Sequence, residues 1–204
     1  TNNYFTFNGK LETGEFNLGR LLNNEKDIGK ITLNVNVDGS SCSGQTVNAK
    51  LHGFINSLEI KQYEYKNINL SGVLSDKTYN GAINIDDPSI NMEFLGKVDF
   101  SSEIYNVDFT ANIARADLCA LNLDKSDSSH TVSFYIKANA QGNSLDNING
   151  EIKLLNSLLT KGSKQIQIYD FSVYAQNSLD SNSLSIRSDF IDADVYGNYQ
   201  MAEI

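Results

Sequence analysis

Apolar and polar residues alternate with a period of two along nearly the whole chain, and this alternation constrains the fold more than any other feature. The clearest run is "ITLNVNV" at 31–37, where every second residue is apolar. Successive side chains of a β-strand point to opposite faces, so such a run predicts a strand with one apolar and one polar face. Strands of this kind are typical of an antiparallel sheet that is wet on one side.

The alternating runs number about a dozen and are separated by turns. Connections such as "LSDKTYNG" at 74–81 are short and rich in turn-forming residues, so sequential strands should pair as a meander. At roughly 4.8 Å per strand such a sheet would extend for about 60 Å, and twisted sheets of more than about ten strands curl or split. We therefore expect an all-β fold over 1–204: one β-rich segment, a long antiparallel sheet curled into a trough or β-taco, with little helix.

Leucines at helical spacing occur in two stretches, 18–29 and 153–162, and offer helix as an alternative to strand there. In the second stretch Gly162 would serve as a C-terminal helix cap. We expect at most a turn or two of helix in either stretch, which would leave the all-β class unchanged.

Glycine stands between two large apolar residues of one strand face at seven places, as in "FLGKVDF" at 94–100. Glycine packs nothing in a strand and loses much backbone freedom on folding, so its repeated use calls for a cause. Glycines on the apolar face allow tight bends and a close approach of the opposite wall. The seven pentads are 7–11, 51–55, 70–74, 79–83, 94–98, 148–152 and 195–199.

Charge and hydropathy disfavour several partners. The chain has 16 Lys and Arg against 25 Asp and Glu, a net charge of −9, and no basic stripe. Nucleic acids and anionic lipid surfaces attract clustered Lys and Arg, so neither is an expected partner. No run approaches the roughly 18 apolar residues that cross a bilayer as a helix. Because Thr1 begins in mid-pattern, we expect an excised fragment or a mature product.

Histidine and cysteine are scattered. His52 and His130 each stand alone in the sequence, without a nearby cysteine or second histidine to complete a zinc site. Cys42 and Cys119 lie far apart, and we expect them to be unpaired, with Cys119 a small buried hydrophobe.

Carboxylates and tyrosines suggest structural roles rather than catalysis. The Asp pair at 86–87 precedes Pro88 in a turn, and the acidic residues of 189–194 flank strand ends, so capping is the simpler prediction than acid–base work. Tyr63 and Tyr65 share a strand face, where packing is more common than sugar stacking. No motif for a nucleophile, phosphate loop, dinucleotide or calcium site occurs. We therefore expect no enzyme activity, no catalytic residue, no metal and no cofactor.

Taken in order, several phrases are similar to a known family. They include "IGKITLNVNVDGSS" at 28–41, the tandem glycine pentads of 51–100, "DFTANIARADLCALNL" at 108–123, and "GNSLDNINGEIKLLNS" at 142–157. Together with "SDFIDADVYGNY" at 188–199 they resemble the translocation and assembly module (TamB-like) family of the AsmA-like superfamily.

The resemblance implies a long periplasmic β-protein, anchored to the inner membrane through parts outside this chain, whose apolar trough holds acyl chains. It implies a phospholipid or another acyl-chain ligand, with transport to the outer membrane or protein assembly there with a barrel partner. The glycines would leave width for an acyl chain between the lining side chains. The residues expected to line the groove are Phe94, Gly96, Val98, Phe100, Val107, Phe109, Ile113, Val132, Phe134, Ile136, Ile148, Gly150 and Ile152.

Two other functions compete with lipid conduction. A closed β-sandwich adhesin or carbohydrate-binding module would show the same short strands and polar loops. A hydrolase with an acidic cleft would need the motifs that the sequence lacks. In the trough, the edge strands would remain unpaired, which predicts end-to-end self-association of this segment.

Overall fold

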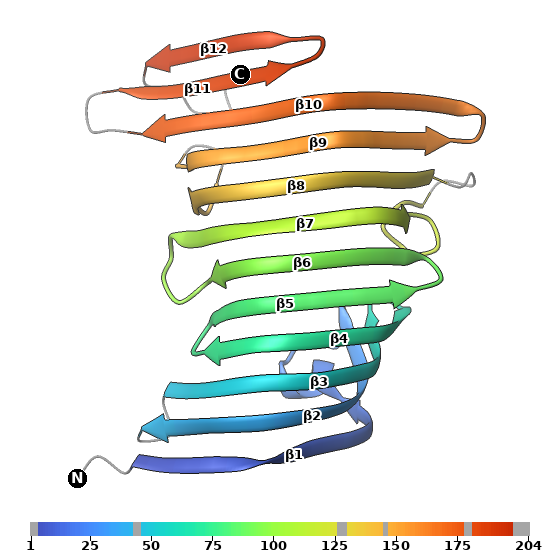
Figure 1. The fold of residues 1–204 in the computed structure, drawn as a ribbon, viewed down its shortest axis with the longest axis vertical. Coiled ribbons are helices and arrows are strands. Elements are labelled where there is room, and N and C mark those ends of the chain that lie inside the picture. The colour runs from blue at the N-terminus through green and yellow to red at the C-terminus, as the bar shows by residue number, and fades with distance from the viewer. Residues whose placement is uncertain (1–3, 43–45, 126–129, 145–146, 178–180, 198–204) are drawn as a thin grey trace.

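The structure, a computed structural model, describes residues 4–42, 46–125, 130–144, 147–177 and 181–197. Over these residues twelve strands pair in chain order to form one antiparallel sheet (Figure 1). This is the predicted meander. The strands are β1 (Tyr4–Asn17), β2 (Ile28–Cys42), β3 (Thr46–Ile60), β4 (Tyr63–Ser75), β5 (Thr78–Asp87), β6 (Ile90–Asp99), β7 (Tyr105–Asp117), β8 (His130–Gly142), β9 (Asn149–Lys161), β10 (Lys164–Asn177), β11 (Asn182–Ser188) and β12 (Asp192–Gly197). Tyr199, in the last glycine pentad, and the side chain of Cys42 lie outside the described part of the chain.

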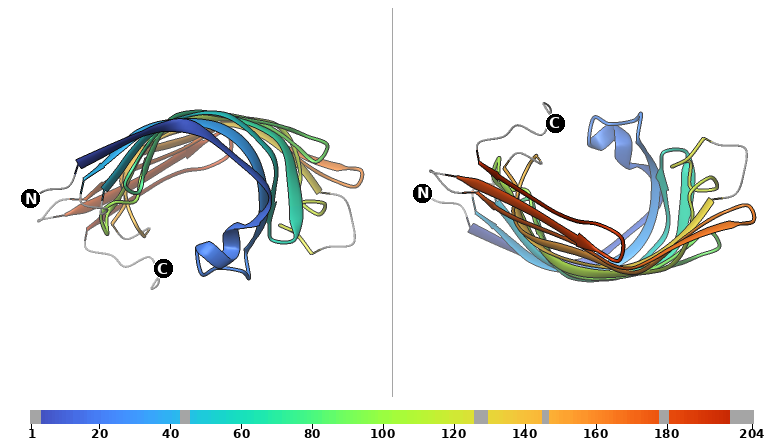
Figure 2. Two further views of the ribbon diagram at one scale, coloured as in Figure 1. Left: turned by 90° about the horizontal axis from the view of Figure 1, so that it is seen from below. Right: turned by 90° about the horizontal axis from the view of Figure 1, so that it is seen from above.

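The sheet is curled about an axis that runs along the stack of strands. Seen along that axis, the backbone of the sheet forms an open arch (Figure 2). The edge strands β1 and β12 do not pair with each other, and eleven interstrand spacings of about 4.8 Å give the arch a length of about 50 Å. The predicted curled trough is therefore confirmed. The described strands form one sheet, whereas a closed sandwich needs two.

Irregular pairing bends the strands so that they follow the arch. The register of β8 against β9 shifts by one residue between Ser133 and Tyr135, opposite Asn156, whose φ is +51°. Glu15 in β1 and Asn67 in β4 likewise have left-handed φ values of +47° and +52° inside a strand. A bulge increases the local twist and bends the strand that carries it.

The stretch 153–162 is strand rather than helix, and the bulge explains its misleading leucine spacing. Leu154 pairs with Ile136, and Leu159 pairs with Val132, four residues earlier on β8. Leu154 and Leu159 therefore share a face although they are five residues apart, which a regular strand does not allow. Gly162 lies after β9 in the turn to β10, with φ +58°, and caps no helix.

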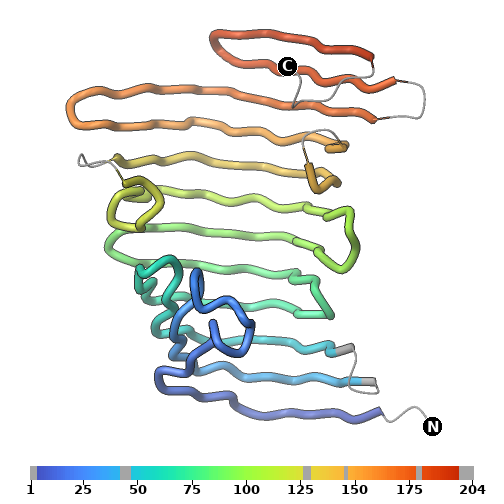
Figure 3. The backbone as a smooth tube through the Cα atoms, turned by 180° about the vertical axis from the view of Figure 1, so that it is seen from behind, coloured from blue at the N-terminus to red at the C-terminus, as the bar shows by residue number. Residues whose placement is uncertain are grey.

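The stretch 18–29 contains a single helical turn, α1 (Leu18–Leu21). Asn17 caps it, because its side-chain oxygen accepts a hydrogen bond of 2.8 Å from the backbone N–H of Arg20. The turn lies on the concave side of the sheet (Figures 2 and 3). Within the described residues, no helix combines the length and apolarity that crossing a membrane requires.

Three neighbouring strands place Gly72, Gly81 and Gly96 side by side, since Gly81 pairs with both of the others. A Cβ added to Gly72 would lie 2.8 Å from the phenol oxygen of Tyr79, and one added to Gly96 would lie 2.6 Å from the Cβ of Phe109. The width that the sequence assigned to an acyl chain is thus occupied by the Tyr79 phenol at Gly72 and Gly81, and by the neighbouring strand β7 at Gly96. Aromatic residues commonly cover strand glycines in this way.

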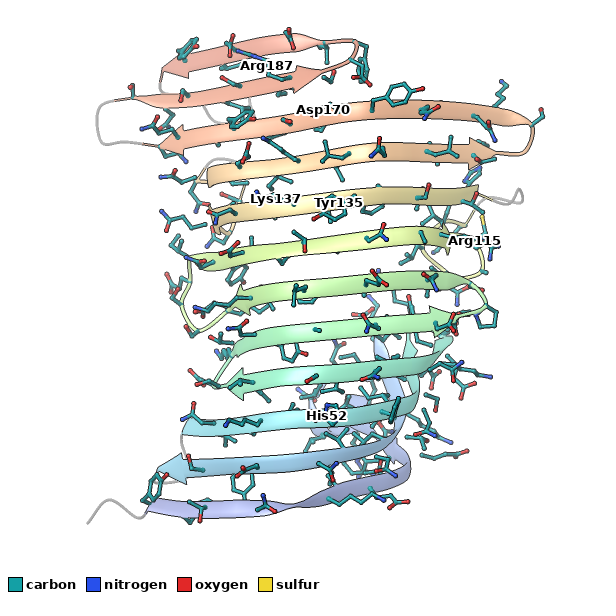
Figure 4. All side chains as sticks on the ribbon, in the orientation of Figure 1. His52, Arg115, Tyr135, Lys137, Asp170 and Arg187 are labelled. Atoms are coloured by element: carbon teal, nitrogen blue, oxygen red, sulfur yellow. The ribbon has the colours of Figure 1, made fainter. Side chains whose placement is uncertain are left out.

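The convex face is polar. In Figure 4, His52, Tyr135 and Lys137 lie on the face toward the viewer, away from α1. His52 pairs across the sheet with polar neighbours and, as predicted, points away from the apolar residues beside it. The row through His52 contains Lys10, Asn36, His52, Ser71, Ala82, Leu95, Thr110, Lys137, Lys153, Ser172, Arg187 and Asp192.

Carboxylates near this face are held by hydrogen bonds. The Ser101 hydroxyl (2.6 Å) and backbone N–H (3.0 Å) donate to Asp99 and hold the pKa of its carboxyl well below the usual range. Hydrogen bonds from Ser185 and Arg187 lower the pKa of Asp194. Asp99 is half-buried and Asp194 is exposed, and hydrogen-bonded carboxylates near a solvated surface each contribute little alone.

Replacement of Gly96 by alanine should destabilise the fold. Its φ of +145° disfavours any L side chain, and a Cβ would lie 2.4 Å from the carbonyl oxygen of Asp108. We expect the free energy of unfolding in urea to fall by at least about 1 kcal/mol. Gly9 is the matched control, because it lies in the same cross-strand row and has nothing within 4 Å of an added Cβ. Equal stability of Gly96→Ala and Gly9→Ala would contradict the close approach.

Stability should decline in acid. A carboxyl whose folded pKa is lowered stabilises the fold above its unfolded pKa of about 4, and this contribution disappears as pH falls toward the folded value. The urea midpoint should therefore drop between about pH 7 and about pH 3. Asp99→Asn removes one such group, so the drop should be smaller in this variant. An unchanged midpoint in the parent chain would show that these hydrogen bonds do not act in solution.

Candidate functional site: an apolar trough

Three apolar rows cross the strands on the concave face. Antiparallel partners lie directly opposite each other, so the register defines each row. The first row contains Leu11, Val35, Gly53, Leu70, Ile83, Phe94, Ala111, Ile136, Leu154, Phe171 and, on β11, Ser188. The second contains Gly9, Val37, Leu51, Gly72, Gly81, Gly96, Phe109, Ala138, Ile152, Val173, Ile186 and Ala193. The third contains Phe7, Gly39, Ala49, Leu74, Tyr79, Val98, Val107, Ala140, Gly150, Ala175, Leu184 and Val195.

These rows form an open face. None of their members carries a charge, and the only hydroxyls among them belong to Tyr79 and to Ser188 at the β11 end of the first row. The second and third rows continue from β1 to β12, so the apolar strip follows the whole trough. Large row members such as Ile83, Phe94 and Leu154 are only half-buried. Among the described residues, Leu121 is the only large side chain that is fully buried. The concave face is thus lined with hydrocarbon and lacks a second layer to cover it.

Aromatic rings form the floor near the middle of the sheet. Phe94 packs against Phe109 with ring centroids 5.2 Å apart, and against Tyr79 at 6.5 Å. The Tyr79 hydroxyl donates a hydrogen bond of 2.9 Å to the carbonyl oxygen of Ala82. Burial raises the pKa of Tyr79, which keeps the phenol uncharged. The Ser188 hydroxyl, the other polar group of the rows, donates to the carbonyl oxygen of Ile191 (3.1 Å), so both hydroxyls are satisfied within the chain.

A cavity of about 370 Å³ opens on β8, β9 and β10. Phe134, Leu154, Ile168 and Phe171 contribute to its wall, and Phe190 adds an apolar side chain from the connection between β11 and β12. No charged residue lines it. Its volume lies in the range of small-molecule sites, and its lining is more uniformly apolar than is usual for such sites.

The structure brings most of the predicted lining residues together. The first row contains Phe94 and Ile136, the second contains Gly96, Phe109 and Ile152, and the third contains Val98, Val107 and Gly150. Ile113 and Phe134 are direct cross-strand partners, and Val132 lines the cavity with Phe134.

Two predicted lining residues lie outside the strands. Phe100 follows the end of β6, is 46% exposed, and packs edge to face on Tyr105 with centroids 5.0 Å apart, so it does not continue the row of Phe94 and Val98. Ile148 precedes β9 and lines a second cavity, of about 390 Å³, with Val107. Strand ends are the least predictable part of an alternating pattern.

The carboxylates and tyrosines considered for chemistry are structural here. Asp87 is buried, accepts hydrogen bonds from the backbone N–H groups of Ser89 (2.8 Å) and Lys66 (3.0 Å), and contacts the Tyr63 hydroxyl. Tyr63 and Tyr65 pack edge to face with centroids 4.9 Å apart. The predicted turn cap and packed tyrosines are confirmed. Nothing in this arrangement pairs two carboxylates for acid–base catalysis.

The sequence misses the surroundings of His130. The fold brings Cys119 and Asp124 to it, with donor atoms of all three within 4.8 Å of one another. The expectation that His130 has no cysteine nearby is therefore wrong, and Cys119 is half-buried beside polar groups rather than an inert hydrophobe. The connection between β7 and β8 folds back on itself, which residue spacing alone does not reveal.

Comparison with known proteins adds no relative. No protein-family model matches the chain, and no curated protein or solved structure matches it either.

Proposed function

We propose that the concave face binds the acyl chains of a phospholipid or a related amphiphile. The chain would then be a segment of a scaffold that conducts lipid to the outer membrane or supports protein assembly there. The observation that carries this proposal is the set of three uncharged apolar rows that run in register along an open trough. An acyl chain is the ligand whose chemistry matches such a surface, because it consists of hydrocarbon and has no group that needs a hydrogen-bond partner.

The energetics of lipid transfer favour a continuous strip over a discrete pocket. Burial of a methylene contributes roughly 0.8 kcal/mol, so two sixteen-carbon chains in water would lose on the order of 20 kcal/mol. A conducting surface must therefore replace the bilayer at every step. Apolar contact is non-directional, so neighbouring positions along the rows hold a chain about equally well and do not trap it.

The dimensions support the same ligand. One leaflet of a bilayer holds acyl chains in about 15 Å of hydrocarbon, half of a core about 30 Å thick. The rows extend for about 50 Å over twelve strands, roughly three times that length. An acyl chain lying along the trough would thus always have further apolar surface ahead of it.

One polar atom in the cavity on β8, β9 and β10 suits an amphiphile. Ser157 lines this cavity, and its buried hydroxyl has no hydrogen-bond partner among the described residues. A buried hydroxyl without a partner costs free energy, which a ligand oxygen would recover by accepting its hydrogen bond. An ester carbonyl at the end of an acyl chain has this property.

The location and partners follow from the family resemblance rather than from the geometry. The trough is the shape that the TamB-like resemblance implies, and the periplasm, inner-membrane anchorage and an outer-membrane barrel partner are parts of the same proposal. The competing adhesin or carbohydrate module was expected as a closed sandwich, and the single sheet removes that support. No observation of the site favours an enzyme.

An aspartate at Phe134 should abolish acyl-chain binding. Phe134 lines the cavity, and a carboxylate there would have to be desolvated by the bound hydrocarbon. We expect the affinity for a fluorescent phospholipid, competed with unlabelled phospholipid, to fall at least about tenfold, which corresponds to about 1.4 kcal/mol. Lipid retained by the purified chain, measured by mass spectrometry, should fall in parallel.

Tyr135→Asp is the matched control, because the neighbouring aromatic residue is 37% exposed on the convex face (Figure 4). It should bind lipid like the parent chain. Ile168→Asp places the same charge in the same cavity from another strand and guards against local misfolding at Phe134. Equal binding by Phe134→Asp, Tyr135→Asp and the parent chain, with unchanged circular dichroism, would exclude the cavity on β8, β9 and β10 as a lipid site.

The edge strands should cause self-association. β1 and β12 each pair on one side only, and an exposed strand edge is a template for a further strand. We expect the weight-average mass in sedimentation velocity to rise with protein concentration. A mass equal to that of one chain at every concentration would contradict this expectation.

A further inference from the structure

Three side chains with metal-binding atoms meet at the connection between β7 and β8. They are Cys119, Asp124 and His130, and one donor atom of each lies within 4.8 Å of those of the other two. His130 is the first residue of β8, and its side chain is only 8% exposed. Its Nδ1 contacts a carboxylate oxygen of Asp124, whose side chain is 32% exposed.

The backbone holds this connection in a defined shape. The N–H of Leu118 donates to the carbonyl of His130 (2.8 Å), and the N–H of Asp124 donates to the carbonyl of Leu118 (3.0 Å). The segment thus returns to the start of β8 and places Cys119 opposite His130. Leu121 is fully buried, and the Asn122 side chain donates to the carbonyl of Lys61 (2.9 Å), in the turn between β3 and β4. Contacts on both sides therefore position the three donors before any ligand arrives.

We propose that Cys119, Asp124 and His130 form a site for a zinc-class divalent ion. Thiolate, imidazole and carboxylate are the three side-chain ligands that Zn²⁺ accepts, and three protein ligands leave one position open for water. A thiolate and a carboxylate neutralise the charge of the ion, while the imidazole remains neutral. Zinc–ligand distances of about 2.0–2.3 Å place tetrahedral donors about 3.5 Å apart, so small side-chain rotations complete the site.

Other uses of the three residues fit less well. The burial of His130 leaves its imidazole little access to a substrate, as a nucleophilic Cys–His–Asp arrangement would require. A hydrogen bond between His130 and Asp124 does not need a thiol, whereas the fold also brings Cys119 within 4.8 Å. A metal ion uses all three groups and needs only the space between them.

The test is a titration of the reduced, metal-free chain with Co²⁺ and then with Zn²⁺. Co²⁺ reports both thiolate ligation, through a sulfur-to-metal charge-transfer band, and tetrahedral geometry, through intense visible bands. We expect one equivalent of Co²⁺ to bind, Zn²⁺ to displace it, and the thermal midpoint to rise with bound metal. Cys119→Ser should lose the charge-transfer band.

Asp124→Asn and His130→Gln should weaken zinc binding, measured by competition with a chromophoric chelator. Loss of a residue that only orients a ligand costs about 10–100-fold in affinity, so loss of a ligand should cost at least as much. Cys42→Ser and His52→Gln are the matched controls, because they remove the other cysteine and the other histidine of the chain. Both should bind metal like the parent.

Two results would overturn the site. One is a parent chain without a cobalt–thiolate band. The other is a band that Cys42→Ser removes as fully as Cys119→Ser does, which would locate the thiolate elsewhere. Circular dichroism of Cys119→Ser without metal should match the parent, and Cys119→Ala provides a second variant if serine perturbs the loop.

Discussion

Cross-strand register is the constraint on which the trough depends. Side chains alternate between faces with a period of two, so a slip of one residue at any pairing would move the apolar side chains of every later strand to the convex face. Eleven pairings keep the three apolar rows on the concave face and place most Lys, Asn, Ser and Asp side chains on the convex face, where Ala82, Leu95 and Tyr135 are exceptions. Where β9 carries an extra residue at Asn156, β10 follows it without a shift, because Leu154 pairs with Phe171 and Leu159 with Ile166. The apolar strip therefore survives the bend.

A single layer leaves this strip short of partners within the chain. Ordinary sheets cover their apolar face with a helix layer or a second sheet. Here the described residues on the concave side provide one helical turn and the connection that carries Leu121. Tyr79 lies over Gly72 and Gly81, and Phe94 packs between Tyr79 and Phe109, but Ile83 and Leu154 remain half-buried. Under the proposed function, a ligand made of hydrocarbon would cover these exposed apolar side chains without closing the sheet.

The fold was largely predictable because alternation is a local signal. The "ITLNVNV" run and its counterparts specified strands, short turns specified the meander, and the strand count specified curling. The bulges were not predictable, because nothing in the sequence distinguishes Asn156 from other polar strand residues until its partners on β8 are known. The extra residue at Asn156 places Leu154 and Leu159 on one face, and this leucine spacing resembles that of a helix. Phe100 continued the pattern by one step after the strand had ended. Cys119 lies near His130 because the backbone of Leu118 hydrogen bonds to His130 at the start of β8. This proximity could not be predicted from the sequence, in which the two residues are eleven positions apart.

Polar contacts line both borders of the trough, and this arrangement bears on how an amphiphile would lie in it. On one border the connections after β3, β5 and β7 are linked to each other: Asn122 reaches Lys61, and Arg115 reaches the carbonyl of Pro88 at 2.8 Å. On the other border Asn143 reaches the carbonyl of Glu103 at 2.8 Å, which links the connections after β6 and β8. Asp87 and the group around His130 lie on the first of these borders. The rows between the two borders carry no charge. Under the proposed function, a molecule with hydrocarbon tails and a polar head would place its tails along the rows and its head at one of the two borders, so the trough would orient a lipid across its width while leaving it free to move along its length.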